Sequence, residues 1–167
     1  MLGGYAGPLR DAVLRAKRPA GVRVVAALAA LLVHGHGASL RAAGAGCVVP
    51  VPMHWWRRSL RGTSAADDLA GGVAALIGLP VSRVLVRRRA TRMQNELPVE
   101  ERPRNVDGAF HVRRRLHGAR VILVDDVMTT GATLAACCRA LTAAGAGGVD
   151  VAVVARADSL GSVDDDA

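Results

Sequence analysis

The chain has 167 residues, a length typical of one domain, and it carries a net charge of +8. Aromatic residues make up only 2% of the chain, so the core must be built from Ala, Val and Leu, which favours helices packed on a Val-rich parallel sheet. We expect a soluble protein, because the longest apolar stretch, Val24–Val33, is too short to span a bilayer. We expect it to be cytoplasmic, because no signal-peptide pattern is present and three cysteines without a Cys-x-x-Cys pair argue against a disulfide framework.

The first 45 residues predict two helices. Tyr5–Arg18 is amphipathic, with apolar residues on one side and arginines and Lys17 on the other. Ala20–Val33 predicts a second helix, which we expect to stop at the run His34–Gly37. The two histidines of that run have no further ligands nearby, which is more typical of a solvated loop than of a metal site.

The remainder of the chain alternates strands with helices. The expected elements are a strand over Cys47–Val51, a helix from Thr63 or Ser64 to about Leu76, strands over Val81–Val86 and Ala119–Val124, a helix over Ala132–Ala144 and a strand over Val149–Ala155. This alternation predicts parallel pairing with right-handed crossovers. The fold class is therefore α/β, a single domain in which a mostly parallel central sheet is flanked by helices. Residues 46–156 form its core, and the acidic tail, 157–167, is expected to be disordered.

Two carboxylates follow the buried strand that ends at Val124. Asp125 and Asp126 lie at the carboxyl end of a parallel strand, where α/β sheets bind their ligands. Carboxylates accept hydrogen bonds from hydroxyl groups, so an acid pair suits the vicinal diol of a ribose. Taken alone, Asp126 is explained equally well as a turn residue.

A Thr/Gly-rich turn then leads into a helix. It offers hydroxyl groups, backbone N–H groups at a helix start and a glycine that allows close approach, which together suit a phosphate. The residues of this anion loop are Thr129, Thr130, Gly131, Ala132 and Thr133. Separately they are ordinary cap and turn residues, but their order behind two acids predicts a site for a phosphorylated ribose.

The segment Val121–Thr133 resembles the phosphoribosyl pyrophosphate (PRPP) binding motif of type I phosphoribosyltransferases. It lacks the Gly-Lys-Ser/Thr of a Walker loop and the glycine spacing of a dinucleotide fingerprint. Further residues occur in the order seen in the ComF-like branch, the competence protein F family related to amidophosphoribosyltransferases. These are Tyr5–Asp11, Val49–Pro52, Arg61 with Gly62, Thr91 with Gln94, Glu101 with Arg102, Asn105 with Val106, and Ala109 with Phe110. The resemblance covers the chain from about Tyr5 to Arg156.

Two departures from that branch affect the expected chemistry. Its members often begin with a four-cysteine zinc hairpin, which this chain lacks, so no structural zinc is expected. The branch also shows an Arg-Gly-Phe-Asn-Gln run after the first loop, where this chain reads Arg61-Gly62-Thr63-Ser64-Ala65. The roles of that Asn and Gln are therefore not carried over.

The resemblance assigns roles to two arginine-bearing loops. The loop after Val51 corresponds to a pyrophosphate-binding loop, with Arg57, Arg58 and Arg61 as donors. The loop after Val86 corresponds to a mobile loop that closes over PRPP and excludes water. Its candidates for contacting pyrophosphate are Arg87, Arg88, Arg89, Arg92, Arg102 and Arg104, although a solvated face explains some of them.

The activity implied by the resemblance is transfer of phosphoribose from PRPP to an unidentified, nitrogenous acceptor, with release of pyrophosphate. Asp125 and Asp126 are the expected catalytic residues, holding the diol beside the ring cation. Mg²⁺ is expected with PRPP, held by ligand oxygens and water rather than by a set of protein ligands. The family places the acceptor under a hood, for which residues 1–45 are the candidate, but no base-reading residues stand out there.

Two other functions stay open. The protein could be a non-catalytic, PRPP-binding regulator, or a competence-related accessory that handles DNA uptake or single-stranded DNA. The net charge fits a nucleic-acid partner, but much of the basic excess lies in the loops that PRPP itself needs, so this partner is not favoured. An Ala-rich helix surface would allow a homodimer, and no membrane partner is expected.

Overall fold

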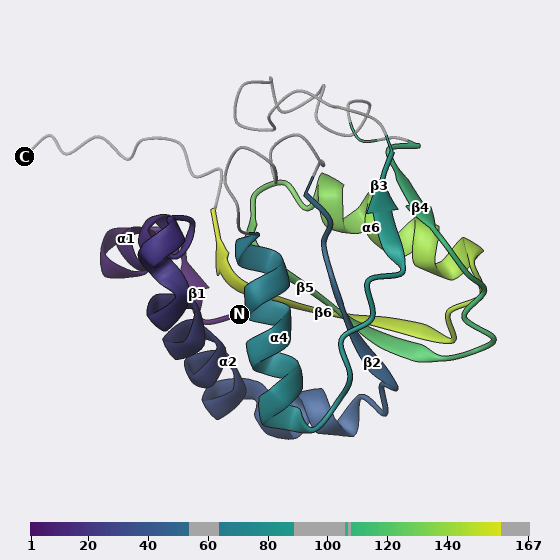
Figure 1. The fold of residues 1–167 in the computed structure, drawn as a ribbon, viewed down its shortest axis with the longest axis horizontal. Coiled ribbons are helices and arrows are strands. Elements are labelled where there is room, and N and C mark those ends of the chain that lie inside the picture. The colour runs from purple at the N-terminus through teal and green to yellow at the C-terminus, as the bar shows by residue number, and fades with distance from the viewer. Residues whose placement is uncertain (54–63, 89–105, 107, 158–167) are drawn as a thin grey trace, which may run out of the picture.

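A parallel sheet forms the centre of the protein (Figure 1). The computed structural model describes residues 1–53, 64–88, 106 and 108–157. In these residues the sheet has the order β1-β6-β5-β2, formed by β1 (Gly3–Gly4), β6 (Gly148–Arg156), β5 (Arg120–Met128) and β2 (Cys47–Pro50). Each neighbouring pair is parallel, with β2 in register from Cys47 opposite Val121 to Pro50 opposite Val124. The predicted fold class is confirmed.

Helices cover both faces of this sheet. One face packs against α1 (Gly7–Ala16), α2 (Val22–Ala42) and α4 (Ala65–Ile77), and the other packs against α6 (Ala132–Ala143). Alternation along β5 divides the two cores, because Ile122 and Val124 face α1, α2 and α4 while Val121 and Leu123 face α6. The N-terminal helices thus share one core with the sheet, as expected for a single domain.

The predicted end of the second helix at His34–Gly37 is wrong. A short 3₁₀ turn, Pro19–Gly21, precedes α2, which then runs without interruption to Ala42. Gly37 and Leu40 are buried on the face that packs toward the core. This packing offsets the cost of helical glycine, about 1 kcal/mol per residue, so tertiary contacts override local propensity.

The length of α2 also bears on the expected absence of a membrane span. By length and composition alone this helix could cross a bilayer, which the ten-residue stretch Val24–Val33 could not. A single helix of this kind near an N-terminus is weak evidence for a membrane span, because core helices of soluble proteins can have the same length and composition. In the structure α2 packs against α1 and α4 and buries Val25, Leu28 and Leu32.

The predicted strand over Val81–Val86 does not join the central sheet. Val81 makes only an isolated parallel bridge with Val48. The regular strand is β3 (Leu85–Arg87), which pairs antiparallel with β4 (Phe110–Val112) in a separate two-stranded sheet. This small sheet buries Leu85 and Phe110 against the α6 side of the core, which the strand–helix alternation could not indicate.

Candidate functional site

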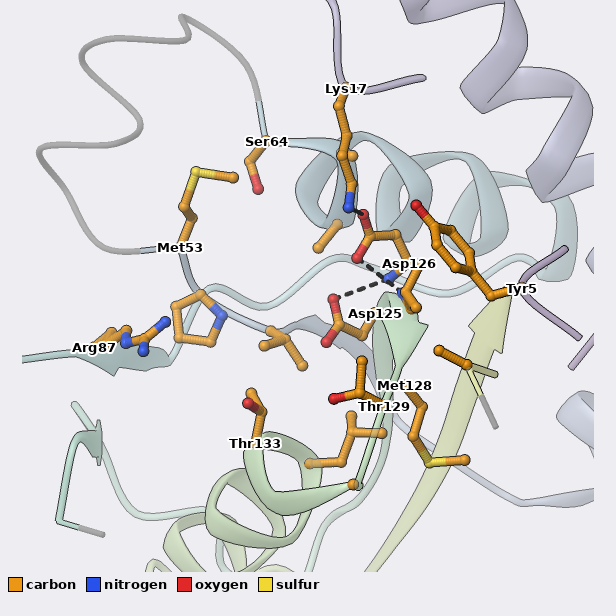
Figure 2. A pocket seen from close by; sticks show the side chains of 18 of the residues that line it. Tyr5, Lys17, Met53, Ser64, Arg87, Asp125, Asp126, Met128, Thr129 and Thr133 are labelled. Atoms are coloured by element: carbon orange, nitrogen blue, oxygen red, sulfur yellow. Dashed lines mark hydrogen bonds and ion pairs between the residues drawn. The ribbon is translucent and has the colours of Figure 1, made fainter. Parts of the chain in front are cut away.

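A cavity of about 520 Å³ lies at the carboxyl end of β5, beside the ends of β2 and the starts of α4 and α6 (Figure 2). This volume is in the range of small-molecule sites. Its polar and charged walls come from distant parts of the chain. Among the described residues they are Tyr5, Lys17, Ser64, Arg87, Asp125, Asp126, Thr129 and Thr133, with apolar residues such as Val51, Pro52, Met53 and Met128 between them.

The two acids project into this cavity from β5 itself. The predicted strand end at Val124 is too early, because β5 continues to Met128 and pairs with β6 up to Arg156. Asp125 Oδ1 accepts a hydrogen bond of 2.9 Å from the Asp126 N–H, and Asp126 Oδ1 accepts one of 2.8 Å from the Val127 N–H. Both carboxylates are therefore fixed against their own backbone, each through its Oδ1 atom (Figure 2).

The acid pair is electrostatically costly. The pKa of Asp125 is raised well above its usual range, first because burial removes the carboxylate from water and second because the Asp126 charge lies beside it. The Lys17 Nζ atom lies 2.8 Å from Asp126 Oδ2 and partly offsets this charge. Asp125 also raises the pKa of the buried Cys137 thiol on α6, although desolvation is the larger cause there.

The anion loop joins β5 to α6. Gly131 is the N-cap of α6 and has a φ of 76°, a left-handed conformation that favours glycine. The Thr130 Oγ1 atom accepts a 3.4 Å hydrogen bond from the Ala132 N–H, the first N–H group of α6. Thr129, Gly131 and Thr133 line the cavity, whereas Thr130 is exposed and, like Ala132, is not part of the wall.

Two of the predicted arginines fall in the described part of the chain. Arg87 lines the cavity from β3, and its guanidinium lies 5.4 Å from the centroid of the Phe110 ring. Arg88 is exposed and does not line it. The remaining candidates, Arg57, Arg58, Arg61, Arg89, Arg92, Arg102 and Arg104, lie outside the described residues.

Sequence reasoning missed Lys17 as a site residue. Its helix periodicity placed it on the solvent side of α1, but it is the C-cap residue of that helix and its side chain turns toward β5. One signal was available, because Lys17 is the single lysine among 22 basic residues. Tyr5 also lines the cavity, although in the sequence it stands out only as part of the family pattern.

Comparison with known proteins agrees with this geometry. Residues 64–166 match the Phosphoribosyl transferase domain family. The chain is 33% identical over 156 residues to "DNA utilization protein YhgH" of Salmonella typhi, covering 91% of the chain and 69% of that protein. This chain belongs to the phosphoribosyltransferase family, in its ComF-like branch.

Other similarities are more partial. This family member is 32% identical to "Competence protein F" of Haemophilus influenzae over 66% of the chain and 50% of that protein. A solved structure of the hypoxanthine phosphoribosyl transferase of Trypanosoma cruzi aligns with 94% of the chain and 72% of its own, with 12% identity and a TM-score of 0.45. The chain thus spans about half of one curated relative and about two thirds of another.

Proposed function

We propose that the cavity binds PRPP with Mg²⁺ and that the protein transfers the phosphoribosyl group to a nitrogenous acceptor, releasing pyrophosphate. The observation that carries this proposal is that the acid pair and the anion loop face one cavity. Asp125 and Asp126 supply acceptors for two neighbouring hydroxyls, while Thr129, Gly131 and Thr133 supply donors for a phosphate. A ribose 5-phosphate carries both groups at opposite ends of one small molecule.

The 5-phosphate would bind where the chain turns from β5 into α6. Backbone N–H groups at the first turn of a helix have no partner within the helix, and the helix dipole adds partial positive charge there. Gly131 has no side chain, so a phosphate oxygen can approach this backbone closely. The hydroxyl groups of Thr129 and Thr133 add donors on the cavity side.

The reaction breaks the C1–O bond of the ribose, and its electron pair leaves with pyrophosphate. The acceptor nitrogen supplies the electron pair of the new C1–N bond and loses its proton to solvent. Positive charge develops on the ring as the bond breaks, and the carboxylates of Asp125 and Asp126 would stabilise it. Arg87 lines the same cavity and would bind the departing pyrophosphate, together with the arginines of the loop after Val51.

Oxygen ligands at the cavity suit Mg²⁺, which prefers phosphate and carboxylate oxygens and keeps several waters. Among the described residues, no group of three or more His, Cys, Asp or Glu side chains gathers into a metal-ligand set. We propose that the ion would bind together with PRPP, held by ligand oxygens and water. Bound in this way, it would offset the negative charge that develops on the leaving pyrophosphate.

Calorimetric titration with Mg-PRPP tests the donor site. Wild type should bind, and Asp125→Asn and Asp126→Asn should each weaken binding about 10- to 100-fold, because a hydrogen bond to a charged group contributes about 1.5–3 kcal/mol. The matched control is Asp11→Asn, an exposed carboxyl on α1 that should leave affinity unchanged. Absence of binding by wild type would refute the proposal.

Pyrophosphate release with a panel of purine and pyrimidine bases then separates an enzyme from a regulator that binds without turnover.

A second candidate function is DNA handling. It is supported by the net charge of +8 and by the names of the relatives, "DNA utilization protein" and "Competence protein F". Basic surfaces bind phosphate backbones with strong salt dependence. The two functions predict different responses to PRPP, because only DNA binding outside the cavity would persist when PRPP is present.

A further inference from the structure

Lys17 connects the N-terminal segment to the acid pair. It is the C-cap residue of α1, and its Nζ atom lies 2.8 Å from Asp126 Oδ2 across the cavity wall (Figure 2). The lysine side chain is 34% exposed and the aspartate side chain 20% exposed, so the pair is more shielded from water than a surface ion pair. Shielding makes such a contact stronger and less sensitive to salt.

This contact leaves the ligand-facing chemistry of the acids intact. Asp126 Oδ1 accepts from the Val127 N–H and Oδ2 contacts Lys17, so both oxygens are held in place while each retains a further lone pair. Asp125 has no contact of this kind with Lys17. Burial and the Asp126 charge raise the pKa of Asp125, and the positive charge of Lys17, which acts without direct contact, lowers it in part.

The charge balance of the cavity shows why a cation is needed there. Among the described residues, the titratable and charged groups that line it are Tyr5, Lys17, Arg87, Asp125 and Asp126. Arg87 lies on β3 and contacts the Phe110 ring, whereas Lys17 contacts the Asp126 carboxylate directly. Without Lys17, two adjacent carboxylates would face a ligand that carries several negative phosphate charges.

We propose that Lys17 is a positioning residue of the donor site, whose ammonium fixes the Asp126 carboxylate and offsets the charge of the acid pair so that both carboxylates meet the ribose hydroxyls in their ionised form. This inference rests on the proposed function. It also gives the N-terminal segment a part in donor binding, since α1 carries a residue that acts through Asp126.

Two substitutions separate the charge of Lys17 from its packing. Lys17→Met removes the ammonium and keeps an unbranched apolar stem, while Lys17→Arg keeps the charge. The matched control is Arg15→Met, which removes an exposed cation from the same helix. Circular dichroism and thermal melting establish that each variant is folded before binding is measured.

The first readout needs no ligand. Carbon-detected NMR titration of the aspartate carboxyl groups should show a higher pKa for Asp125 in Lys17→Met than in wild type, with Lys17→Arg close to wild type and Arg15→Met unchanged. An unchanged Asp125 titration in a folded Lys17→Met would overturn the inference. This outcome is independent of whether PRPP is the ligand.

The second readout is the affinity for Mg-PRPP between pH 5 and 8. Lys17→Met should weaken binding on the order of tenfold and shift the acidic limb of the binding profile to higher pH, and Lys17→Arg should restore both. If wild type binds and Lys17→Met binds equally well or more tightly, the inference fails and the proposed function stands. If wild type does not bind, the proposed function fails, and the NMR titration still decides the effect of Lys17 on Asp125.

Discussion

Gly72 on α4 packs directly against Ala29 on α2. A Cβ atom added at Gly72 would lie 2.8 Å from the Ala29 Cβ, closer than two carbon atoms can approach. The two helices therefore meet at a point where only glycine fits, and this contact holds the N-terminal segment onto the core that supports the cavity.

The first prediction follows from this contact. Gly72→Ala should destabilise the protein by about 1–3 kcal/mol, the usual cost of overpacking a core. The neighbouring Gly71 has nothing within 4 Å of an added Cβ, so Gly71→Ala should stabilise the same helix by about 0.5–1 kcal/mol. Urea unfolding of both variants checks the opposite signs. Equal effects at the two positions would contradict the packing described.

The second prediction concerns stability and pH. The pKa of Asp125 is higher in the folded than in the unfolded protein, so the folded state binds more protons in the window between the two values. Stability contributed by this group is present below the unfolded pKa, near 3.9, and is lost as pH rises through the folded pKa, at about 1.4 kcal/mol for each unit of difference.

Replacing the Asp125 carboxyl by an amide should therefore stabilise the fold while it weakens donor binding. Thermal melting of Asp125→Asn should give a higher Tm than wild type at pH 8 and a diminishing difference toward pH 4. Asp11→Asn, an exposed site, should show no such trend. If the Tm of Asp125→Asn at pH 8 were equal to or below that of wild type, the ionised Asp125 carboxylate would not destabilise the fold.

The third prediction concerns the anion loop. Gly131→Ala should destabilise the protein by about 1–2 kcal/mol, because its φ of 76° is costly for any residue with a Cβ atom. The added Cβ would meet only Met128 Sδ, at an ordinary 3.7 Å, so the cost arises from the backbone. Asn tolerates this conformation better, and Gly131→Asn should lose less stability in the same melting assay. If a folded Gly131→Ala variant bound Mg-PRPP with unaltered affinity, the anion loop would not be part of the ligand site.

The fourth prediction distinguishes donor binding from DNA binding. Single-stranded DNA should bind weakly, with an affinity that falls steeply as salt increases, and Mg-PRPP should compete with it if both use the cavity. Arg113, Arg114 and Arg115 are exposed beyond β4 and do not line the cavity. Tight binding that persists in Mg-PRPP and is lost when these three arginines become serine would favour the DNA function instead.

Much of the fold could be predicted because its pattern is local. Four apolar residues before Asp125 predict a buried strand. Of the two predicted caps, Thr63 and Ser64, it is Ser64 that accepts a hydrogen bond from the Asp67 N–H at the start of α4. The extension of β5 to Met128 was not predictable in this way, because the two carboxylates interrupt the apolar run that marks a strand.

The features that were missed depend on contacts between distant segments. Gly35 and Gly37 stay helical because α2 packs on the core, and β3 finds its partner in a three-residue strand that carries too little pattern to recognise. Lys17 reads as a surface residue of α1, since its carboxylate partner comes more than half the chain later. Both acids and three of the five anion-loop residues line one cavity, but Lys17, which contacts Asp126, could not be recognised from the sequence pattern.

The unequal lengths of the central strands have a consequence for how this site can be altered. Pairing between β2 and β5 reaches only Pro50 and Val124, while β6 accompanies β5 as far as Met128 (Figure 1). The cavity lies beyond the end of β2, where Val51, Pro52 and Met53 line it together with Asp125, Asp126, Val127 and Met128 of β5. Extending β2 so that it pairs with β5 beyond Val124 would place its backbone in this space. A redesign that made the sheet more regular at this edge would therefore remove the site.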